Sequence, residues 1–499
     1  MALSIELSED NPWWKDPKNI DNDLRIKEWE ESAIKWIPRI QYTFDFTQDL
    51  VYSLRGPRQI GKTTMIKLLI REFLKNGISP WNIMYYAFDI ENNPKELVTL
   101  IKNYFDNTKR QRNGNRCYLF LDEVSSIKNW QKGIKRLWDQ KRLENCTVIA
   151  TGSHSVDLKL STEKLPGRRG DTTDAIDKIM LPMKFSEFVS LMDPNLEKII
   201  KNNFLSKSNR ISLFEKISKG EIPTPLENIQ AYLPELNRYF MDYILTGGIP
   251  KAINQYIDTK IIHEGTYTDH LNAILGDLVT LNKNENTFRQ LVENIVKSIG
   301  WTSSWRSLRK DTDIGTENTV SQYVSTLEDM FILSVLYQYD SEKKKALYQK
   351  EKKIHFHDPF YFNVLNSWIS GTESFDTSRK FIENTENQGK LVEGIVANHM
   401  IRLAFLRSHK KQTFVYSNHI YYWKYGKDNE VDLIYNDGLG IEIPIEIKFQ
   451  NKLTNRDLDG IINFKKYTGT KNALLLTKDI LSVERECVMI PISIFLLLI

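Results

Sequence analysis

The 499-residue chain contains little cysteine, no long apolar run and almost no net charge. Its three cysteines, Cys117, Cys146 and Cys487, are far apart and odd in number, which fits neither a disulfide framework nor a zinc cluster. We therefore expect a reducing, cytoplasmic setting. The longest apolar run, PISIFLLLI, is far shorter than a membrane span, and the first thirty residues are rich in Asp, Glu, Lys and Trp. We expect neither a secretion signal nor a transmembrane helix.

The charge is high but balanced, with 68 basic and 64 acidic residues and a net charge of +4. Whole-chain electrostatics therefore does not indicate a nucleic-acid binder, and any basic surface must be local. We find no internal repeat and no low-complexity segment. The chain is too long for a single core, and its length predicts about three domains.

The most specific signal is the stretch VYSLRGPRQIGKTTMIKLLIREFL. Val51 to Leu54 is typical of a strand, and the apolar spacing of Met65, Leu68, Leu69 and Phe73 predicts a helix. Between them, GPRQIGKT matches the phosphate-binding pattern G-x-x-x-x-G-K-[ST] in the strand–loop–helix context that it requires. A chance glycine-rich turn before a helix is the alternative, and this context argues against it.

The loop residues predict a site for ATP and Mg²⁺. Gly56 and Gly61 let the backbone curl so that its N–H groups and the start of the helix face the phosphates. Lys62 would reach the β and γ phosphates, and the hydroxyl of Thr63 would ligate Mg²⁺. The predicted nucleotide-binding residues are Gly56, Pro57, Arg58, Gln59, Ile60, Gly61, Lys62, Thr63 and Thr64.

A second carboxylate-bearing segment, CYLFLDEVSSI, follows about sixty residues later. Tyr118 to Leu121 predicts a buried strand, after which Asp122 would hold Mg²⁺ through water and Glu123 would polarise the attacking water. A strand that simply ends in a polar turn is the alternative, and the pairing with the P-loop disfavours it. The helix WQKGIKRLWDQ and the strand TVIATGSH come next, an order that predicts a parallel, doubly wound sheet.

The end of that third strand offers two candidate sensors of the γ phosphate. These are Thr151 and Ser153, of which we prefer Ser153, although Thr-Gly-Ser is also ordinary turn chemistry. In LPGRRG, either Arg168 or Arg169 would serve as an arginine finger across a subunit boundary, which implies a homo-oligomer. A solvated basic loop is the alternative reading of these arginines.

Taken together, these motifs resemble those of an archaeal and bacterial AAA-type ATPase family. Its members carry a C-terminal domain of unknown function that often ends in a nuclease-like fold. The resemblance rests on the order of NPWW, LRGPRQIGKTT, FLDEV, ATGS, LPGRRG, LPMKFSEF and LTGGIP. It covers essentially the whole chain and implies an ATPase core to about residue 185, followed by a helical lid, but it supplies no substrate.

The middle of the chain suits a winged helix. TFRQLVENIVKSIG, SSWRSLRKD and TENTVSQYVSTLEDM are three short helical patterns, the last with a cap-like Thr316, and a β-rich stretch follows. The third helix would expose residues that can read base edges, Asn318, Ser321, Gln322 and Ser325, but it has no Arg or Lys. DNA contact and packing against other parts of the assembly both stay open. The run EKKKALYQKEKK would be either a basic wing tip touching phosphates or a solvated hairpin.

The last region reads as helix, three strands, helix and strand. Its segments are GKLVEGIVANHMIRLAF, YYWKY, EVDLIYN, IPIEIKF, TNRDLDGIINFKKY and NALLLTK. This order resembles the core of the PD-(D/E)xK nuclease superfamily, and the resemblance assigns the motif to Asp432, Glu446 and Lys448, with Glu393 as a fourth member. In that reading Asp432 and Glu446 share one or two Mg²⁺ ions, and Lys448 positions water or offsets developing charge.

An ordinary half-solvated strand is the alternative reading of this motif. Along IPIEIKF, apolar residues alternate with Glu446 and Lys448, so E-x-K alone proves nothing. Asp432 is the stronger signal, because Asp is disfavoured within strands and strict alternation places it on the same face as Ile434. A carboxylate on a partly apolar face needs a partner, and a shared metal ion would supply one.

We therefore expect a multidomain α/β protein with an AAA-type P-loop parallel sheet and a C-terminal restriction-endonuclease-like domain. The predicted regions are an N-terminal extension (1–40), the ATPase core (41–185), a helical lid (186–285), a winged-helix domain (286–388) and the nuclease-like domain (389–499). We expect a cytoplasmic, oligomeric ATPase whose nucleotide state controls a module acting on DNA. The rivals are a nucleotide-dependent switch or scaffold, and a DNA-remodelling ATPase that does not cleave.

Overall fold

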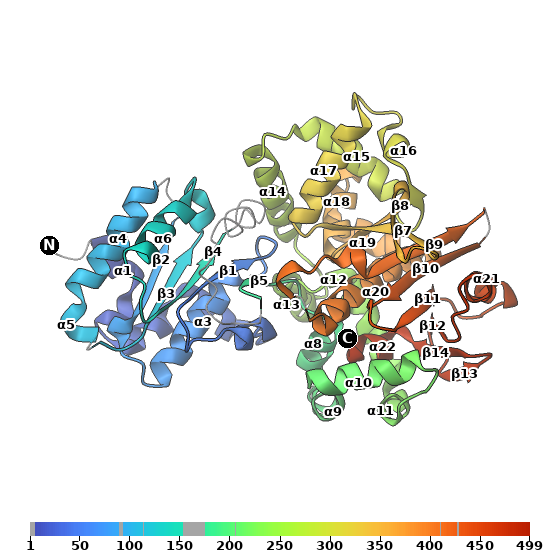
Figure 1. The fold of residues 1–499 in the computed structure, drawn as a ribbon, viewed down its shortest axis with the longest axis horizontal. Coiled ribbons are helices and arrows are strands. Elements are labelled where there is room, and N and C mark those ends of the chain that lie inside the picture. Colours follow the sequence, from blue (N-terminus) through green and yellow to red (C-terminus); the bar gives the residue numbers. More distant parts are fainter. Residues whose placement is uncertain are drawn as a thin grey trace. The chain divides into compact units, whose positions relative to one another are not determined.

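The computed structural model describes residues 5–88, 93–112, 114–152, 175–204, 206–409, 411–426 and 429–499. The chain divides into two compact units, which we name unit 1 (Met1–Leu181) and unit 2 (Pro182–Ile499) (Figure 1). Each unit contains its own sheet and its own buried core. No helix among the described residues combines the length and the apolar character that crossing a membrane requires.

Unit 1 is built on a five-stranded parallel sheet with the order β2-β3-β4-β1-β5. Its strands are β1 (Leu50–Arg55), β2 (Ile83–Ala87), β3 (Cys117–Asp122), β4 (Cys146–Thr151) and β5 (Asp177–Ile179). Strands β1 and β4 are buried along their whole length, as expected for parallel strands covered on both faces. The predicted parallel sheet is confirmed.

Two helices of unit 1, α3 and α6, correspond to the predicted helical patterns. The helices of unit 1 are α1 (Ile5–Asp10), α2 (Leu24–Glu31), α3 (Lys62–Lys75), α4 (Pro94–Asn107), α5 (Lys109–Arg112) and α6 (Trp130–Asp139). In α3 the residues with helical apolar spacing, Met65, Leu68, Leu69 and Phe73, are all buried. Helix α4 begins with a capping box between Asn93 and Glu96, which satisfies the first free N–H groups of the helix.

The NPWW segment covers the exposed edge of the sheet at β2. Asn11 pairs with the backbone of Tyr85 through both halves of its amide, at 2.7 Å each. The indole N–H groups of Trp13 and Trp14 donate to the carbonyl of Ile83 at 3.3 and 2.9 Å. These contacts satisfy strand groups that would otherwise be open to pairing with another chain. Residues 11–14 are therefore part of the folded body of unit 1.

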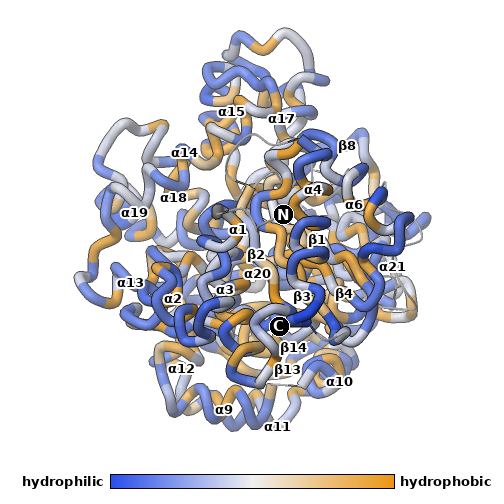
Figure 2. Tube along the Cα trace, turned by 90° about the vertical axis from the view of Figure 1, so that its left-hand side faces the viewer, coloured by the Kyte–Doolittle hydropathy of each residue, from blue (hydrophilic) through white to orange (hydrophobic). Residues whose placement is uncertain are grey.

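Unit 2 begins with a run of helices, and its later helices lie between or after its strands. Its helices are α8 (Phe185–Met192), α9 (Pro194–Phe204), α10 (Lys207–Ser218), α11 (Thr224–Ile229), α12 (Leu233–Thr246), α13 (Pro250–Thr259), α14 (Glu264–Thr280), α15 (Glu285–Lys297), α16 (Trp305–Arg309), α17 (Glu317–Asp329), α18 (Pro359–Ser370), α19 (Ser374–Glu383), α20 (Thr385–Arg407), α21 (Asp459–Thr468) and α22 (Ile492–Leu498). Surface helices such as α9 alternate hydrophilic and hydrophobic residues (Figure 2), and α9 buries Leu196, Ile200 and Phe204.

A mixed nine-stranded sheet with the order β13-β14-β12-β11-β10-β9-β7-β8-β6 runs through unit 2. Its strands are β6 (Thr302–Ser303), β7 (Leu333–Asp340), β8 (Lys345–Phe356), β9 (Ile420–Tyr425), β10 (Asn429–Asn436), β11 (Glu442–Lys448), β12 (Ala473–Thr477), β13 (Ser482–Glu484) and β14 (Cys487–Pro491). Strands β9, β10 and β11 are antiparallel neighbours, whereas β11, β12 and β14 run parallel.

The predicted order of elements in unit 2 is confirmed. Helices α15, α16 and α17 precede the β7–β8 hairpin, and Thr316 caps α17 by accepting a hydrogen bond from the N–H of Thr319. Helix α20, three antiparallel strands, α21 and β12 then follow. The hairpin expected as a wing joins the C-terminal strands in one sheet, because β7 pairs in parallel with β9 at Gln338 and Tyr422. Helix α20 packs across β8, β9, β10 and β11.

Candidate nucleotide site and a buried carboxylate cluster

The loop between β1 and α3 is shaped by its glycines. Gly56 and Gly61 have φ values of 150° and 95°, which side chains rarely adopt. A Cβ on Gly56 would lie 2.0 Å from the carbonyl oxygen of Met180, so the loop backbone packs directly against the residue that follows β5. The loop also leaves the carboxyl end of β1, which lies between β4 and β5, at the edge where ligands bind in parallel α/β sheets.

Lys62 and Thr63 face the groups that the sequence assigns to phosphate and metal chemistry. The ammonium of Lys62 donates to the carbonyl oxygens of Gly56 and Pro57, at 3.0 and 2.8 Å. The hydroxyl of Thr63 donates to Oδ2 of Asp122 at 2.8 Å. Of the other predicted loop residues, Pro57 and Ile60 are buried, Arg58 and Thr64 are half-buried, and Gln59 is exposed.

Asp122, at the end of β3, is the centre of a hydrogen-bonded group and is only 2% exposed. Its carboxylate accepts from Thr63, from the hydroxyl of Tyr85 at 3.0 Å and from the hydroxyl of Thr151. Thr151 in turn accepts from the backbone N–H of Glu123 at 3.1 Å. Glu123 is half-buried and has a φ of 54°, so the chain turns sharply directly after the strand.

These oxygen donors fit Mg²⁺. Thr63 and Asp122 present a hydroxyl and a carboxylate side by side, which is the hard-oxygen donor set that Mg²⁺ prefers. When bound there, Mg²⁺ would supply positive charge beside the phosphates of a nucleotide. Lys62 and the backbone N–H groups of the loop would hold those phosphates, and Glu123 would orient a water molecule and accept its proton.

Sequence reasoning found Asp122 and Thr63 but missed Tyr85, and it ranked Thr151 below Ser153. Tyr85 and Thr151 reach Asp122 because β2, β3 and β4 are parallel neighbours whose carboxyl ends meet at one edge. Their polar character near the ends of strands that flank β3 was the sequence signal that could have identified Tyr85 and Thr151 as partners of Asp122. The preferred sensor, Ser153, and the candidate arginine fingers, Arg168 and Arg169, lie outside the described residues.

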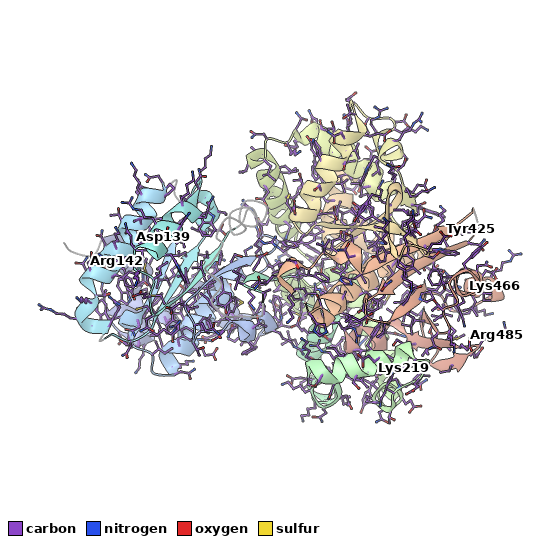
Figure 3. All side chains as sticks on the ribbon, in the orientation of Figure 1. Asp139, Arg142, Lys219, Tyr425, Lys466 and Arg485 are labelled. Atoms are coloured by element: carbon purple, nitrogen blue, oxygen red, sulfur yellow. The ribbon has the colours of Figure 1, made fainter. Side chains whose placement is uncertain are left out.

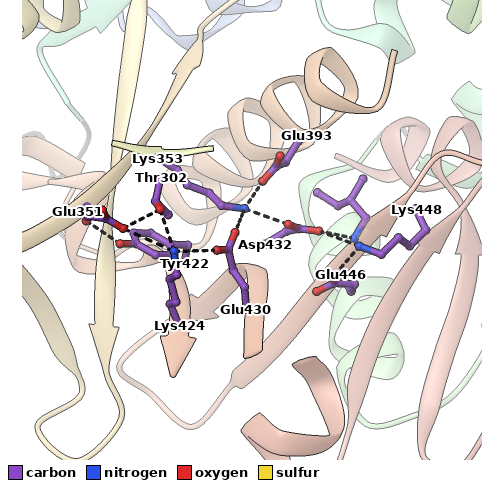
Figure 4. Close-up of polar contacts among 11 residues, drawn as sticks. Thr302, Glu351, Lys353, Glu393, Tyr422, Lys424, Glu430, Asp432, Glu446 and Lys448 are labelled. Atoms are coloured by element: carbon purple, nitrogen blue, oxygen red, sulfur yellow. Dashed lines mark hydrogen bonds and ion pairs between the residues drawn. The ribbon is translucent and has the colours of Figure 1, made fainter. Parts of the chain in front are cut away.

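In unit 2 the predicted motif residues lie together on three elements (Figure 4). Glu393 comes from α20, Asp432 from β10, and Glu446 and Lys448 from β11. Two further residues complete the group, which we call the carboxylate cluster. They are Lys353 of β8 and Glu430 of β10. Lys353 ends the run EKKKALYQKEKK that we expected as a basic wing tip or a solvated hairpin, and both expectations are wrong for this residue because its side chain is buried.

Lys353 lies at the centre of the carboxylate cluster and is 1% exposed. Its ammonium forms an ion pair with Glu393, and it lies 2.8 Å from Oε1 of Glu430 and 2.9 Å from Oδ1 of Asp432. An ammonium has three N–H donors, so each can meet one carboxylate. Lys353 is therefore a fully engaged cation inside the protein.

Lys448 engages the other side of the carboxylate cluster. Its ammonium pairs with Oε1 of Glu446 and lies 3.9 Å from Oδ2 of Asp432. The same Asp432 oxygen accepts the backbone N–H of Ile447 at 2.9 Å. The second oxygen of Glu446, Oε2, is buried and has no hydrogen-bond partner among the residues that the structure describes.

The local strand geometry differs from the simple alternation expected for β10. Its register against β9 shifts between Val431 and Ile434, and both side chains pack in one buried cluster with Tyr421 and Trp423. The expectation that Asp432 shares a face with Ile434 through strict alternation is therefore wrong, because an irregularity re-aims the side chains. Glu446 is 6% exposed, so β11 is not a half-solvated strand either.

Burial and charge act against each other across the carboxylate cluster. Burial raises the pKa of Glu393 and of Glu446 to about 8. Burial alone would also raise the pKa of Asp432, but the charges of Lys353 and Lys448 hold it below its ordinary value. For Lys353, three carboxylates outweigh burial, so its pKa lies well above the ordinary value. Burial would lower the pKa of Lys448, but Asp432 and Glu446 likewise hold it above its ordinary value, so both lysines stay charged at neutral pH.

As arranged, the carboxylate cluster does not fit a metal ion. Among the described residues no three His, Cys, Asp or Glu side chains converge as metal ligands do. The predicted ligands Glu393, Asp432 and Glu446 are brought together, but the ammonium groups of Lys353 and Lys448 lie between them. Lys353 had a weak signal in the sequence, since in KKIHF it opens an alternation with apolar residues.

Comparison with known families identifies three segments of the chain. Residues 48–189 match the AAA domain family. This segment is an AAA domain. Residues 237–372 match a domain of unknown function, DUF8612, and residues 388–495 match another, DUF4143. The expected AAA-type core with C-terminal domains of unknown function is thus confirmed at this level, and the winged-helix and nuclease-like folds stay predictions.

Two curated proteins are similar to the chain. An uncharacterized protein of Methanocaldococcus jannaschii is 22% identical over 419 residues, which cover 81% of this chain and 75% of that protein. An uncharacterized protein of Haemophilus influenzae is 20% identical over 307 residues, which cover 60% of this chain and 65% of that protein.

Two solved structures are also similar, with low TM-scores. The Aeropyrum pernix ORC1 protein in complex with DNA has a TM-score of 0.24 and 11% identity, covering 71% of this chain and 96% of that one. A Thermotoga maritima RuvB variant has a TM-score of 0.25 and 16% identity, covering 64% of this chain and 88% of that one.

Proposed function

We propose that unit 1 binds and hydrolyses ATP with Mg²⁺ at the loop between β1 and α3. The main support is the hydrogen bond from Thr63 to Asp122, which joins the first turn of α3 to the end of β3. A hydroxyl and a carboxylate lie side by side there, and Lys62, the residue before Thr63, donates to two backbone carbonyls of the loop. Exchanging those neutral partners for phosphate oxygens is favourable for an ammonium.

Further residues of the AAA domain enter this proposal from the sequence. Glu123 orients the attacking water, and Ser153 senses the γ phosphate. Arg168 or Arg169 acts as an arginine finger in a neighbouring subunit, so the active form is a homo-oligomer. The setting is cytoplasmic.

Phosphate release with ATP and Mg²⁺ tests the assignment of the loop. Lys62→Ala should lower the turnover rate by roughly 100-fold or more, because it removes the cation that faces the phosphates. Lys75→Ala, an exposed lysine on the same helix, is the matched control and should behave as wild type. Turnover by Lys62→Ala at the wild-type rate would refute the assignment.

For unit 2 we propose action on DNA under control of the nucleotide state of unit 1. The support is the order of α20, β9, β10, β11, α21 and β12, together with the gathering of Asp432, Glu446, Lys448 and Glu393. Helix α17 also exposes Asn318, Gln322 and Ser325, which can hydrogen-bond to base edges. We assign these parts to a nuclease-like domain and a winged-helix domain.

A panel of single-stranded, duplex, flapped and junction DNA, incubated with ATP and Mg²⁺, separates cleavage from its rivals. Cleavage that Asp432→Ala abolishes would show a working nuclease, with the exposed Asp479→Ala as control. DNA binding without cleavage, unchanged by Asp432→Ala, would favour a remodelling ATPase. An absence of both would favour a switch or scaffold.

A further inference from the structure

Lys353 is buried, whereas many other cationic side chains of unit 2 reach solvent. Lys219, Lys466 and Arg485 project from the surface (Figure 3). Lysine is almost never fully buried unless its charge is paired. The charge of Lys353 is paired in this way, because Glu393, Glu430 and Asp432 surround its ammonium.

The ammonium lies between two of the predicted metal ligands, Glu393 and Asp432. It contacts Glu393 on α20 and Asp432 on β10 at once, so it supplies the positive charge that a divalent cation would supply to the same oxygens. Carboxylate oxygens are the ligands that hard divalent cations prefer. Oε2 of Glu446 is buried and has no hydrogen-bond partner among the described residues, so it is a carboxylate oxygen that neither lysine engages. One ammonium and one metal ion cannot occupy the same position.

The strand that carries Lys353 is irregular directly before it. In the ladder between β7 and β8, Tyr337 pairs with Lys352, but the next residue, Gln338, pairs with Leu347. Residues 348–351 of β8 therefore stand outside that ladder. Lys353 comes from this hairpin, whereas the carboxylates come from α20, β10 and β11. Lys353 itself is paired with Leu336 of β7 and Thr302 of β6, so its ammonium is held at the cluster by a strand that carries none of the carboxylates.

We propose that Lys353 is a built-in cation that seals the carboxylate cluster, so that a divalent cation binds Glu393 and Asp432 only after this ammonium has left. The seal is an autoinhibitory contact of the β7–β8 hairpin on the nuclease-like region. Its role in DNA chemistry rests on the proposed function of unit 2. Whether Lys353 blocks metal binding can be tested by measuring metal binding alone, without DNA.

The seal can be tested by titrating the full chain with Mn²⁺ in the absence of nucleotide. Electron paramagnetic resonance measures the free Mn²⁺ and so gives the number of bound ions and their affinity. Lys353→Met should gain one Mn²⁺ that binds at least tenfold more tightly than any at this cluster in wild type. Lys352→Met is the matched control and should match wild type, because Lys352 is equally buried, at 4% exposed, and lies over the ring of Trp305. Adding Asp432→Asn to Lys353→Met should abolish the gained ion.

Two results would overturn the proposal. Wild type could bind Mn²⁺ at this cluster, in a manner sensitive to Asp432→Asn, as tightly as Lys353→Met does. Alternatively, folded Lys353→Met could gain no ion. If Lys353→Met is unfolded in chelator, recovery of its fold by Mn²⁺ supports the seal, and failure to recover contradicts it. DNA cleavage is not a readout here, so the seal and the nuclease assignment fail separately.

Discussion

The two candidate sites use the same residue types but give them opposite partners. In unit 1, Asp122 is held by the hydroxyls of Thr63, Tyr85 and Thr151, and Lys62 by backbone carbonyls. In unit 2, every carboxylate of the cluster is next to an ammonium, and Lys353 is saturated by three of them. The carboxylate in unit 1 therefore has neutral partners, whereas those in unit 2 have charged ones.

This difference decides which site can accept a cation directly. A hydrogen bond to a charged group contributes about 1.5 to 3 kcal/mol net, and the hydroxyl and carbonyl partners in unit 1 can be exchanged for metal or phosphate without leaving a second buried charge unpaired. Removing one partner of a buried ion pair costs about 3 to 5 kcal/mol, because it leaves an uncompensated charge. Under the two proposals, the site in unit 1 accepts Mg²⁺ and ATP directly, and the cluster in unit 2 is closed until an ammonium moves.

The largest effect is expected at Glu123. Glu123→Gln keeps the shape of the side chain but removes the proton acceptor, so ATP turnover should fall by about 100-fold or more. Binding of a fluorescent ATP analogue should stay unchanged, because Lys62 and Thr63 are intact. Turnover within a few-fold of wild type would exclude Glu123 as the general base.

The second effect concerns the packing of the loop in unit 1. Gly56→Ala places a Cβ 2.0 Å from the carbonyl of Met180, so unit 1 should lose about 2 kcal/mol or more of unfolding free energy, together with nucleotide binding. Gly77→Ala is the matched control, since Gly77 also has positive φ but open space around it, and should cost about 1 kcal/mol. Urea unfolding measures both, and equal losses would contradict the packing account.

The third effect is a pH dependence of the stability of unit 2. Glu393 and Glu446 have folded pKa values of about 8, above the ordinary carboxyl value, so the folded state holds protons that the unfolded state has lost. The stability of unit 2 should therefore fall as pH rises from about 7 to about 8, by at most about 1.4 kcal/mol per pH unit for each proton. At lower pH the opposite contribution comes from four histidines whose pKa values burial lowers, His270, His355, His357 and His399.

Glu446→Gln should reduce the slope of stability against pH by the contribution of up to one bound proton. Glu484→Gln, at an exposed position, should leave this slope unchanged. Hydrogen exchange of the amides of α20 across this pH range reports the stability of unit 2 separately from unit 1. A slope that Glu446→Gln does not alter would exclude Glu446 as the source of the proton linkage.

The smallest effect is expected at Thr151, which links Asp122 to the backbone of Glu123. Thr151→Val removes these neutral hydrogen bonds, so ATP turnover should fall by about fivefold. Thr147→Val is the matched control at the other end of β4, where the hydroxyl donates to the carbonyl of Gln48. Equal effects of the two substitutions on turnover would show that Thr151 acts only through strand stability.

The sequence predicted the parts that depend on local pattern. The loop from Gly56 to Thr63 and the carboxylates after β3 lie within short segments, so their elements and order could be read directly. Tyr85 could not be assigned to Asp122, because their contact depends on the parallel pairing of β2 with β3. In unit 2 the order of helices and strands was predictable for the same local reason.

The chemistry of the carboxylate cluster was not predictable in the same way. Lys353 is 40 residues from Glu393 and 79 from Asp432, so only the shared nine-stranded sheet brings them together. Because the pairing of β10 with β9 is irregular near Asp432, strict alternation along the strand does not predict which face the Asp432 side chain lies on. A motif of Asp, Glu and Lys gives the residue types, whereas their protonation and metal affinity depend on distant partners.

The most direct test of the central claim, that the nucleotide site of unit 1 governs action on DNA, is ATP turnover of the full chain with and without DNA. The account predicts that at least one form among single-stranded, duplex, flapped and junction DNA raises Mg²⁺-dependent turnover several-fold in wild type. Lys62→Ala should show no turnover in either condition. Wild-type turnover that no DNA form changes would contradict the claim.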